Sequence, residues 1–146
     1  MVAFTDRGQE FSGLLGEIVR VNGLLLSAGA ALARPAGLTG ARWQVLAVVD
    51  HGPVTAAQVA RTLGLARQTV RETVASLTSL GMVSHRHNPR DRRARQLVLT
   101  PRGRAALRLV ERRQAAWTNQ LAARATLTDL RTATGILRDL ADLLEG

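Results

Sequence analysis

The stretch Asn88–Gly103 reads N-P-R-D-R-R-A-R-Q-L-V-L-T-P-R-G. Its first half places arginines around one aspartate, and its second half, Q-L-V-L-T, has the alternation of a half-buried strand. Leu97 and Leu99 would share one face of that strand. Thr100 can cap a new helix, with Pro101 in the first turn, where its missing N–H leaves no hydrogen bond unmade. The stretch therefore predicts an arginine-rich turn, a strand and the start of a helix.

A second strand is expected immediately before this turn. Residues 82–87 read M-V-S-H-R-H, and the next four, N-P-R-D, combine residue types that favour turns. Two short strands around such a turn form a β-hairpin, in which Val83 can pack beside Leu97 and Leu99. The sequence therefore predicts a hairpin with four arginines in or beside its turn.

Two short helices precede the hairpin. Thr55–Gln58 reads T-A-A-Q, a capping-box pattern that starts a helix, and Gly64 suits a left-handed helix exit. The next helix carries Val70, Val74 and Leu77 on one face, and its first turn is polar and basic on the other. Two helices joined by a tight glycine turn are typical of a helix-turn-helix, whose second helix recognises DNA.

Longer helices flank this central part, and a further helix is expected after Thr39. The first helix carries an apolar seam with spacings of three and four, made by Phe11, Leu14, Ile18, Val21, Leu25, Ala28 and Leu32. The last helix, expected to begin after Thr128, carries a similar seam made by Leu130, Ala133, Leu137, Leu140 and Leu144. So small a domain cannot cover both seams, so we expect a second copy to bury them; packing within one chain is the alternative.

The predicted fold class is mainly α (an α+β winged helix) in a single domain of residues 1–146. We expect a winged helix-turn-helix over residues 38–100. Residues 1–34 and 101–146 are expected to form long N- and C-terminal dimerisation helices.

The net charge of +9 is concentrated in one window of the chain. All 20 basic residues are arginine, and residues 86–113 hold ten of them against Asp91 and Glu111. Clustered guanidinium groups suit a polyanion such as double-stranded DNA. The alternative is a solvated face whose arginines reflect coding preference, which explains arginine in place of lysine but not the clustering.

Composition also argues against several functions. The chain has no cysteine, no tyrosine and three scattered histidines, and it has no glycine-rich phosphate loop, so we expect no enzyme and no cofactor. His85 and His87 share one face of a strand, but their setting is cationic and we predict no metal site. With only short uninterrupted apolar runs and no secretion signal, we expect a cytoplasmic, nucleoid-associated protein without a membrane partner.

The segment D-R-R-A-R-Q-L-V-L-T (Asp91–Thr100) resembles the D-x-R-x-x-x-L-x-L-T wing pattern of the MarR family of bacterial transcriptional regulators. L-G-L-A-R-Q-T-V (63–70) and T-P-R-G (100–103) are similar to that family as well. The resemblance implies a dimeric, mostly repressor-type DNA-binding protein that often releases DNA when a small molecule binds. The family commonly has serine where Ala66 stands, so the recognition helix loses a cap worth about 1 kcal/mol. This departure leaves open a co-regulator that dimerises without binding DNA.

Base-reading residues are expected at the start of the recognition helix. Gln68 can pair with adenine, Arg71 with guanine, and the Thr69 methyl with the thymine methyl. Arg67 is expected to contact phosphate, which orients the protein without specifying sequence.

The hairpin supplies the remaining predicted DNA contacts. We expect Arg92 to enter the minor groove with Arg90 beside it. Asp91 is expected to hold the guanidinium of Arg93 bidentately and so set the shape of the wing; the alternative is a plain turn-forming role for Asp91. Two further arginines are expected to contact phosphate, namely Arg86 and Arg95.

An effector pocket is a further expectation. Trp43 and Trp117 lie on helices that, in the family, border a crevice, and they could line a site for a small aromatic or anionic effector. Arg42 or Arg113 would then be the anion partner. The alternative is that both tryptophans belong to the core.

The sequence thus predicts a sequence-specific DNA-binding transcriptional regulator. The expected form is a homodimeric repressor of a pseudo-palindromic operator, released by a small-molecule effector. A non-specific architectural DNA-binding protein is the alternative.

Overall fold

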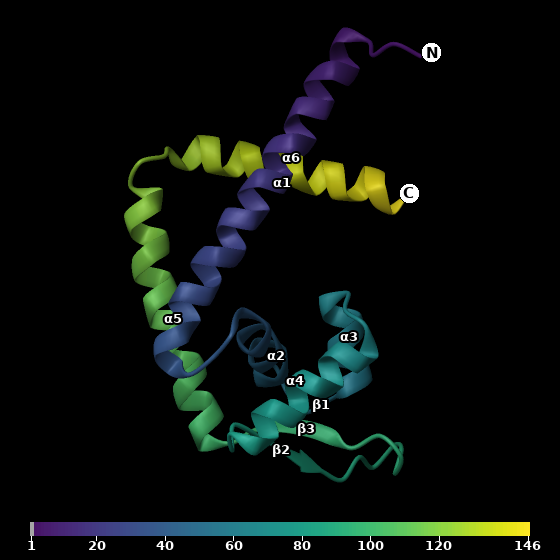
Figure 1. Cartoon of the computed structure of the whole chain (residues 1–146), viewed down its shortest axis with the longest axis vertical. Helices are drawn as coiled ribbons and strands as arrows, with labels where there is room; N and C mark the ends of the chain where they lie inside the picture. Colours follow the sequence, from purple (N-terminus) through teal and green to yellow (C-terminus); the bar gives the residue numbers. More distant parts are fainter. Residues whose placement is uncertain (1) are drawn as a thin grey trace. The chain divides into compact units, whose positions relative to one another are not determined.

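The computed structural model describes residues 2–146 and divides after Val110 into two compact units. The first unit holds most of the elements, and the second holds the end of α5 and the whole of α6 (Figure 1). In chain order the elements are α1 (Asp6–Ala33), the 3₁₀ turn η1 (Arg34–Ala36), α2 (Gly40–Asp50), β1 (Val54–Thr55), α3 (Ala56–Leu63), α4 (Arg67–Ser79), β2 (Val83–Arg86), β3 (Gln96–Leu99), α5 (Pro101–Ala122) and α6 (Leu127–Glu145).

The predicted hairpin is confirmed, and it is part of a three-stranded antiparallel sheet in the order β1-β3-β2. Val83 pairs with Leu99, and His85 pairs with Leu97. The sequence reasoning missed β1, whose Val54 pairs with Leu97 on the other edge of β3. Two residues are too few to show an alternating pattern, and β1 exists because β3 offers it a partner.

Capping residues define the helix starts as predicted. Thr39 Oγ1 accepts the N–H of Arg42 (3.1 Å) at the start of α2. Thr55 and Gln58 form the complete capping box of α3, with bonds of 2.8 and 3.2 Å. Gly64 ends that helix at a φ of 64°, a left-handed conformation that suits glycine.

The predicted start of the last helix is wrong by two residues. Thr126, not Thr128, caps α6, because its Oγ1 accepts the N–H of Asp129 (3.1 Å). Either threonine could cap a helix, so the local pattern did not distinguish them.

A single core cluster joins α2, α3, α4, the sheet and the beginning of α5. Leu46, Leu77, Leu97 and Leu107 are fully buried, each contributed by a different element. The first ten residues of α5 thus pack as part of the winged helix, although the sequence reasoning placed them in the dimerisation part. The dimerisation role of the remaining residues stays a prediction.

The first helix buries little of its apolar seam. Ala33 is its only buried residue, while Phe11, Val21 and Leu25 have exposed fractions of 42%, 42% and 53%. Within residues 2–146, the segment Asp6–Ala36 is long and apolar enough to cross a membrane by length and composition alone, and its 18-residue window is not buried. The absence of a membrane partner therefore stays a prediction, and the seam of α1 requires a covering surface of some kind.

The beginning of α5 is pressed against the end of the loop before β2. A Cβ atom added to Gly103 would lie 2.0 Å from the carbonyl oxygen and 2.9 Å from the carbonyl carbon of Met82. The same loop is tied to α5 by Thr100, whose backbone N–H donates to the Met82 carbonyl (3.1 Å). Only glycine permits this approach of helix and loop backbones, which explains the glycine in T-P-R-G.

We therefore expect Gly103→Ala to lower the free energy of unfolding by about 3 kcal/mol, because the helix must move away from a backbone group that cannot yield. Gly40→Ala is the matched control, since nothing lies within 4 Å of a Cβ at this helical position. The control should gain about 0.5–1 kcal/mol from lower backbone entropy in the unfolded chain. Urea unfolding followed by circular dichroism measures both; an unchanged midpoint for Gly103→Ala would contradict the packing described.

Candidate nucleic-acid interface

The N-terminal half of α4 is divided sharply into a buried and an exposed face. Val70 and Val74 are buried in the core, whereas the side chains predicted to contact DNA are all exposed. These exposed side chains are Arg67, Gln68, Thr69 and Arg71. Ala66 at the N-cap makes no side-chain hydrogen bond, so the start of the recognition helix lacks the cap that serine would supply.

One of the predicted base readers already has a partner on its own helix. Gln68 Nε2 donates to Glu72 Oε1 (3.2 Å), one turn further along α4. This contact orients the amide at the exposed face. To pair bidentately with adenine, Gln68 would have to exchange this carboxylate for the base.

The turn of the wing is shaped by two short polar side chains. Asn88 is buried, and its Oδ1 accepts the N–H of Arg90 (3.0 Å). Asp91 Oδ1 accepts the N–H of Arg93 (2.9 Å). Both are Asx turns, in which the side chain bonds the backbone two residues on.

The predicted ion pair between Asp91 and Arg93 is therefore wrong. Across the described residues, no guanidinium group lies within ion-pair distance of the Asp91 carboxylate. The physical reason is that an exposed pair of this kind must order a long side chain for little gain, whereas the Asx turn uses a backbone donor already in place. The alternative considered from the sequence, a turn-forming Asp91, is what the structure has.

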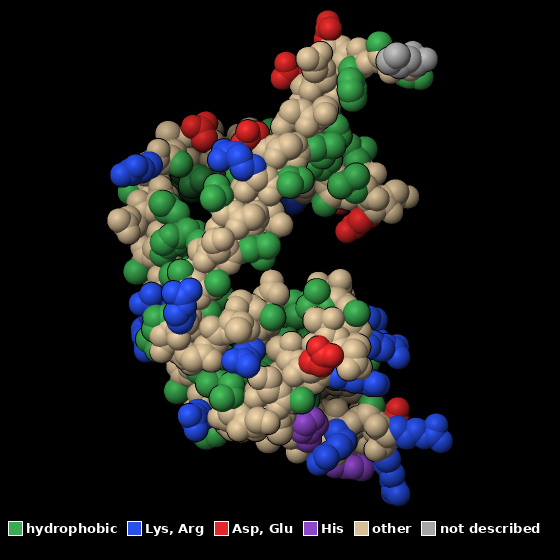
Figure 2. Space-filling view, in the orientation of Figure 1, with side chains coloured by type: hydrophobic (Ala, Val, Ile, Leu, Met, Phe, Trp, Pro, Cys, Tyr) green, Lys and Arg blue, Asp and Glu red, His purple; other side chains and the backbone are tan. Residues whose placement is uncertain are grey.

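The arginines of the wing are exposed and gather at one end of the first unit. Figure 2 shows their side chains at the lower right, over the hairpin tip drawn in Figure 1. The exposed members are Arg90, Arg92, Arg93 and Arg95. Arg86 differs, because its Nε donates to Gln96 Oε1 (3.2 Å) and so links the two strands at the pair where the wing loop begins.

A concave surface lies where α3, α4 and the hairpin meet, and we call it the basic hollow. Its volume is about 300 Å³, and its lining consists of Thr55, Ala56, Ala57, Arg67, Arg71, His85, Arg93, Ala94, Arg95 and Leu97. The structure thus brings together arginines from the recognition helix and from the wing. The sequence reasoning did not foresee that Arg71 and Arg93 line the same concavity, nor that the start of α3 contributes to it. The one signal in the sequence was the capping box at Thr55, because it predicts the start of a helix, where the first backbone N–H groups have no acceptor within the helix.

The four residues predicted to form an effector pocket are divided between the two units. Arg42 donates from Nη2 to Ser76 Oγ (2.6 Å), which links α2 to α4. Trp43 is half-buried against the core cluster and packs beside Gly29 of α1. Arg113 and Trp117 belong to the second unit, where Trp117 is half-buried. An effector role for these residues stays a prediction.

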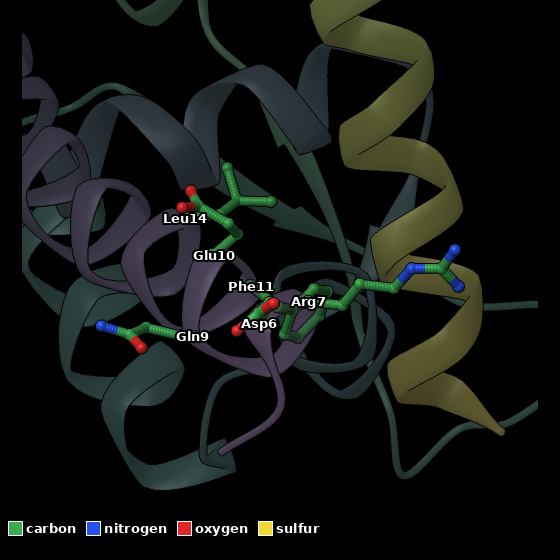
Figure 3. Close-up of a pocket in the computed structure, with 6 residues that line it drawn as sticks. All are labelled: Asp6, Arg7, Gln9, Glu10, Phe11 and Leu14. Atoms are coloured by element: carbon green, nitrogen blue, oxygen red, sulfur yellow. The ribbon is translucent and has the colours of Figure 1, made fainter.

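A larger hollow lies along the N-terminal part of α1 (Figure 3). Its volume is about 630 Å³, but all six lining residues come from one helix. In Figure 3 the side chains of Arg7, Gln9 and Leu14 point in different directions, so they do not converge on a ligand. Within residues 2–146 no group of three or more histidine, cysteine or acidic side chains could hold a metal ion.

Comparison with known proteins identifies the family. Residues 36–94 match the MarR family. An uncharacterized Mycobacterium tuberculosis protein, Rv2011c, is 38% identical over 113 residues, which cover 77% of this chain and 79% of the relative. The transcriptional repressor CouR, bound to a 23-mer DNA duplex, is similar with a TM-score of 0.80 at 26% identity, covering 95% of this chain and 99% of that chain.

A second solved structure is CouR from Rhodococcus jostii RHA1 bound to p-coumaroyl-CoA. It matches with a TM-score of 0.73 at 25% identity over 85% of this chain and 88% of that chain. These likenesses confirm the predicted winged-helix fold class and the expectation that the chain is not an enzyme. The chain belongs to the MarR family of transcription regulators, which are DNA-binding proteins built on the winged helix.

Proposed function

We propose that this protein is a homodimeric, sequence-specific repressor of a pseudo-palindromic operator, located in the cytoplasm on the nucleoid and released by a small-molecule effector. The observation that carries the proposal is the adjacency of two surfaces in one compact unit. The exposed polar face of α4 and the arginine-rich wing meet at the basic hollow. A recognition helix for the major groove and a wing for the neighbouring minor groove require this adjacency.

The electrostatics of the wing support a DNA partner. The wing arginines form no ion pair with any described residue, so their mutual repulsion is not relieved within residues 2–146. A narrow minor groove, where phosphates of both strands crowd together, would relieve it and would attract Arg92 in particular, with Arg90 beside it. Arg86 and Arg95 are proposed to contact phosphate.

The sequence specificity is proposed to come from α4. Gln68 and Thr69 present base-compatible groups on the exposed face of its first turn, beside Arg67 and Arg71. Side chains on a helix are held more precisely than side chains on a loop, and the buried face of α4 anchors this helix in the core.

The apolar seam of α1 supports a homodimer. A second copy would cover Phe11, Val21 and Leu25, which are exposed in one chain, and the exposed leucines of α6 offer a further apolar surface. A two-fold symmetric dimer would set two recognition helices about 34 Å apart, one turn of DNA, which is why we propose a pseudo-palindromic operator.

An effector can release DNA only if it favours one spacing of the two recognition helices over another, because only a difference in affinity shifts an equilibrium between two forms. The CouR structure with p-coumaroyl-CoA supports an aromatic or anionic ligand class, and we propose that Arg42 and Trp43 of the first unit contact it. Arg42 is the informative member, because its bond to Ser76 connects α2 to the recognition helix. An anion that drew Arg42 away from Ser76 would loosen that connection.

Selection of bound fragments from the protein's own genome tests the central claim. Fragments that share a pseudo-palindrome should bind at least about 10³-fold more tightly than random duplexes at the same salt concentration. The logarithm of the affinity should fall linearly with the logarithm of the salt concentration on both duplexes. Equal affinity for selected and random duplexes would identify a non-specific architectural protein instead.

Arg92→Ala should weaken binding to the selected duplex and lower the salt slope by about one, because one guanidinium no longer displaces counterions. The far-ultraviolet circular dichroism and the dimer should remain unchanged, since Arg92 is exposed. Arg124→Ala, in the exposed loop before α6, is the charge-matched control and should bind as the wild type does. Fluorescence anisotropy over a salt series measures these effects; wild-type binding by Arg92→Ala would refute the wing assignment.

Leu25→Asp should convert the dimer to a monomer, because it places a charge in the proposed apolar contact between two chains. Ser27→Asp is the control, because Ser27 is also exposed and lies about 160° around the same helix from Leu25, so the same charge falls outside the seam and should leave the dimer intact. Sedimentation velocity at micromolar concentration distinguishes the two states. A dimer that survives Leu25→Asp would remove α1 from the interface.

A further inference from the structure

The basic hollow is strongly and uniformly positive. Arg67 and Arg71 reach it from α4, Arg93 and Arg95 reach it from the wing, and His85 lies on β2 between them. None of the residues that line it is acidic. Four guanidinium groups around one concavity repel each other, and an anion in that concavity would relieve the repulsion of all four together.

These guanidinium groups have no partner within the part of the chain that the structure describes. Arg20, Arg42, Arg86 and Arg108 all donate to carboxylate, amide or hydroxyl oxygens of other side chains. By contrast, no hydrogen bond or ion pair of residues 2–146 involves the guanidinium of any arginine in the hollow. An unengaged guanidinium keeps its whole fork of N–H donors available for an oxygen anion.

The start of α3 adds backbone donors to the same hollow. The capping box uses the N–H groups of Thr55 and Gln58. It leaves Ala56 and Ala57, the first two residues of the helix, without an acceptor inside the helix, and both line the hollow. The positive end of the helix dipole lies at this point as well. The volume of about 300 Å³ equals roughly ten waters, at about 30 Å³ each, which is room for one phosphodiester group and its hydration.

The position of the hollow indicates that this phosphate belongs to the DNA backbone. A recognition helix occupies the major groove, and the wing reaches into the adjacent minor groove. One sugar–phosphate strand separates these two grooves, so this strand must pass between α4 and the wing. The basic hollow is the concavity at that place.

We propose that the basic hollow holds a backbone phosphate of the strand between the two grooves, bound jointly by Arg71 of α4 and Arg93 of the wing. The proposal rests on the proposed function, and it changes the roles of two residues. Arg71 becomes a phosphate ligand instead of a base reader, and Arg93 becomes its partner instead of a structural element of the wing. One anion shared by two elements locks their spacing, so the helix and the wing bind as one unit.

The test uses the full-length protein and the duplex obtained by genomic selection, with Arg71→Ala, Arg93→Ala, the double variant and the control Arg124→Ala. Each single variant should bind about tenfold more weakly, and the salt slope should fall by about 0.9 per lost phosphate contact. The loss should be the same on selected and random duplexes, because phosphates carry no sequence information. The double variant should bind only slightly more weakly than either single variant, because the two arginines share one anion.

Phosphate neutralisation identifies the bound group directly. In a set of duplexes, each backbone phosphate in turn is replaced by an uncharged methylphosphonate. At one position the replacement should weaken wild-type binding about tenfold and should leave binding by the double variant unchanged. Circular dichroism of every variant confirms that the exposed substitutions leave the fold intact.

Three results would overturn the proposal. The first is a loss for Arg71→Ala that depends on one G·C pair, which would make Arg71 a base reader. The second is a phosphate scan in which the double variant stays sensitive at every position. The third is a double variant whose loss equals the sum of the two single losses, which would mean that Arg71 and Arg93 bind separate groups. Failure of the proposed function is separate, since it appears as equal wild-type affinity for selected and random duplexes.

Discussion

The recognition surface depends on one cluster of buried leucines. Leu46, Leu77, Leu97 and Leu107 come from α2, α4, β3 and α5, and none of them is exposed. Each buried leucine contributes about 1.5–3 kcal/mol, and because all four share one cluster, none of the elements can move without disturbing the others. The distance between the recognition helix and the wing is therefore set by apolar packing, away from the exposed polar surface.

The apolar packing of α4 and β3 stabilises the fold, so the exposed side of the winged helix can carry arginines that repel each other in the isolated chain. The arginines of the wing and of the basic hollow have no acidic partners among the described residues. The turn that carries them is shaped by Asn88 and Asp91 through backbone hydrogen bonds, so its geometry does not consume a guanidinium group. Structure and binding thus use different atoms of the same turn, and the charges remain available for a polyanion.

The two ends of α5 belong to different physical environments. Near Gly103 the helix lies against the Met82 carbonyl, and Arg108 Nη2 donates to Oδ1 and Oδ2 of Asp50 at 3.2 and 3.1 Å. Beyond Val110 it belongs to the second unit, with α6. The chain therefore passes from the first unit into the second within a single helix.

The sequence alone determined the winged-helix class, the helix caps at Thr39 and Thr55, the left-handed exit at Gly64, the hairpin and the basic character of the recognition surface. All of these follow from local periodicity, from hydrogen bonds within a few residues, or from charge counts, which are readable in a linear chain. Other features became visible only in the folded chain. These are that β1 joins the sheet, that the start of α5 belongs to the core, that Asp91 accepts from the backbone N–H of Arg93 instead of from its guanidinium, and that Arg71 and Arg93 line one hollow. These features depend on which distant segments the buried leucines bring together, and no local pattern contains that information.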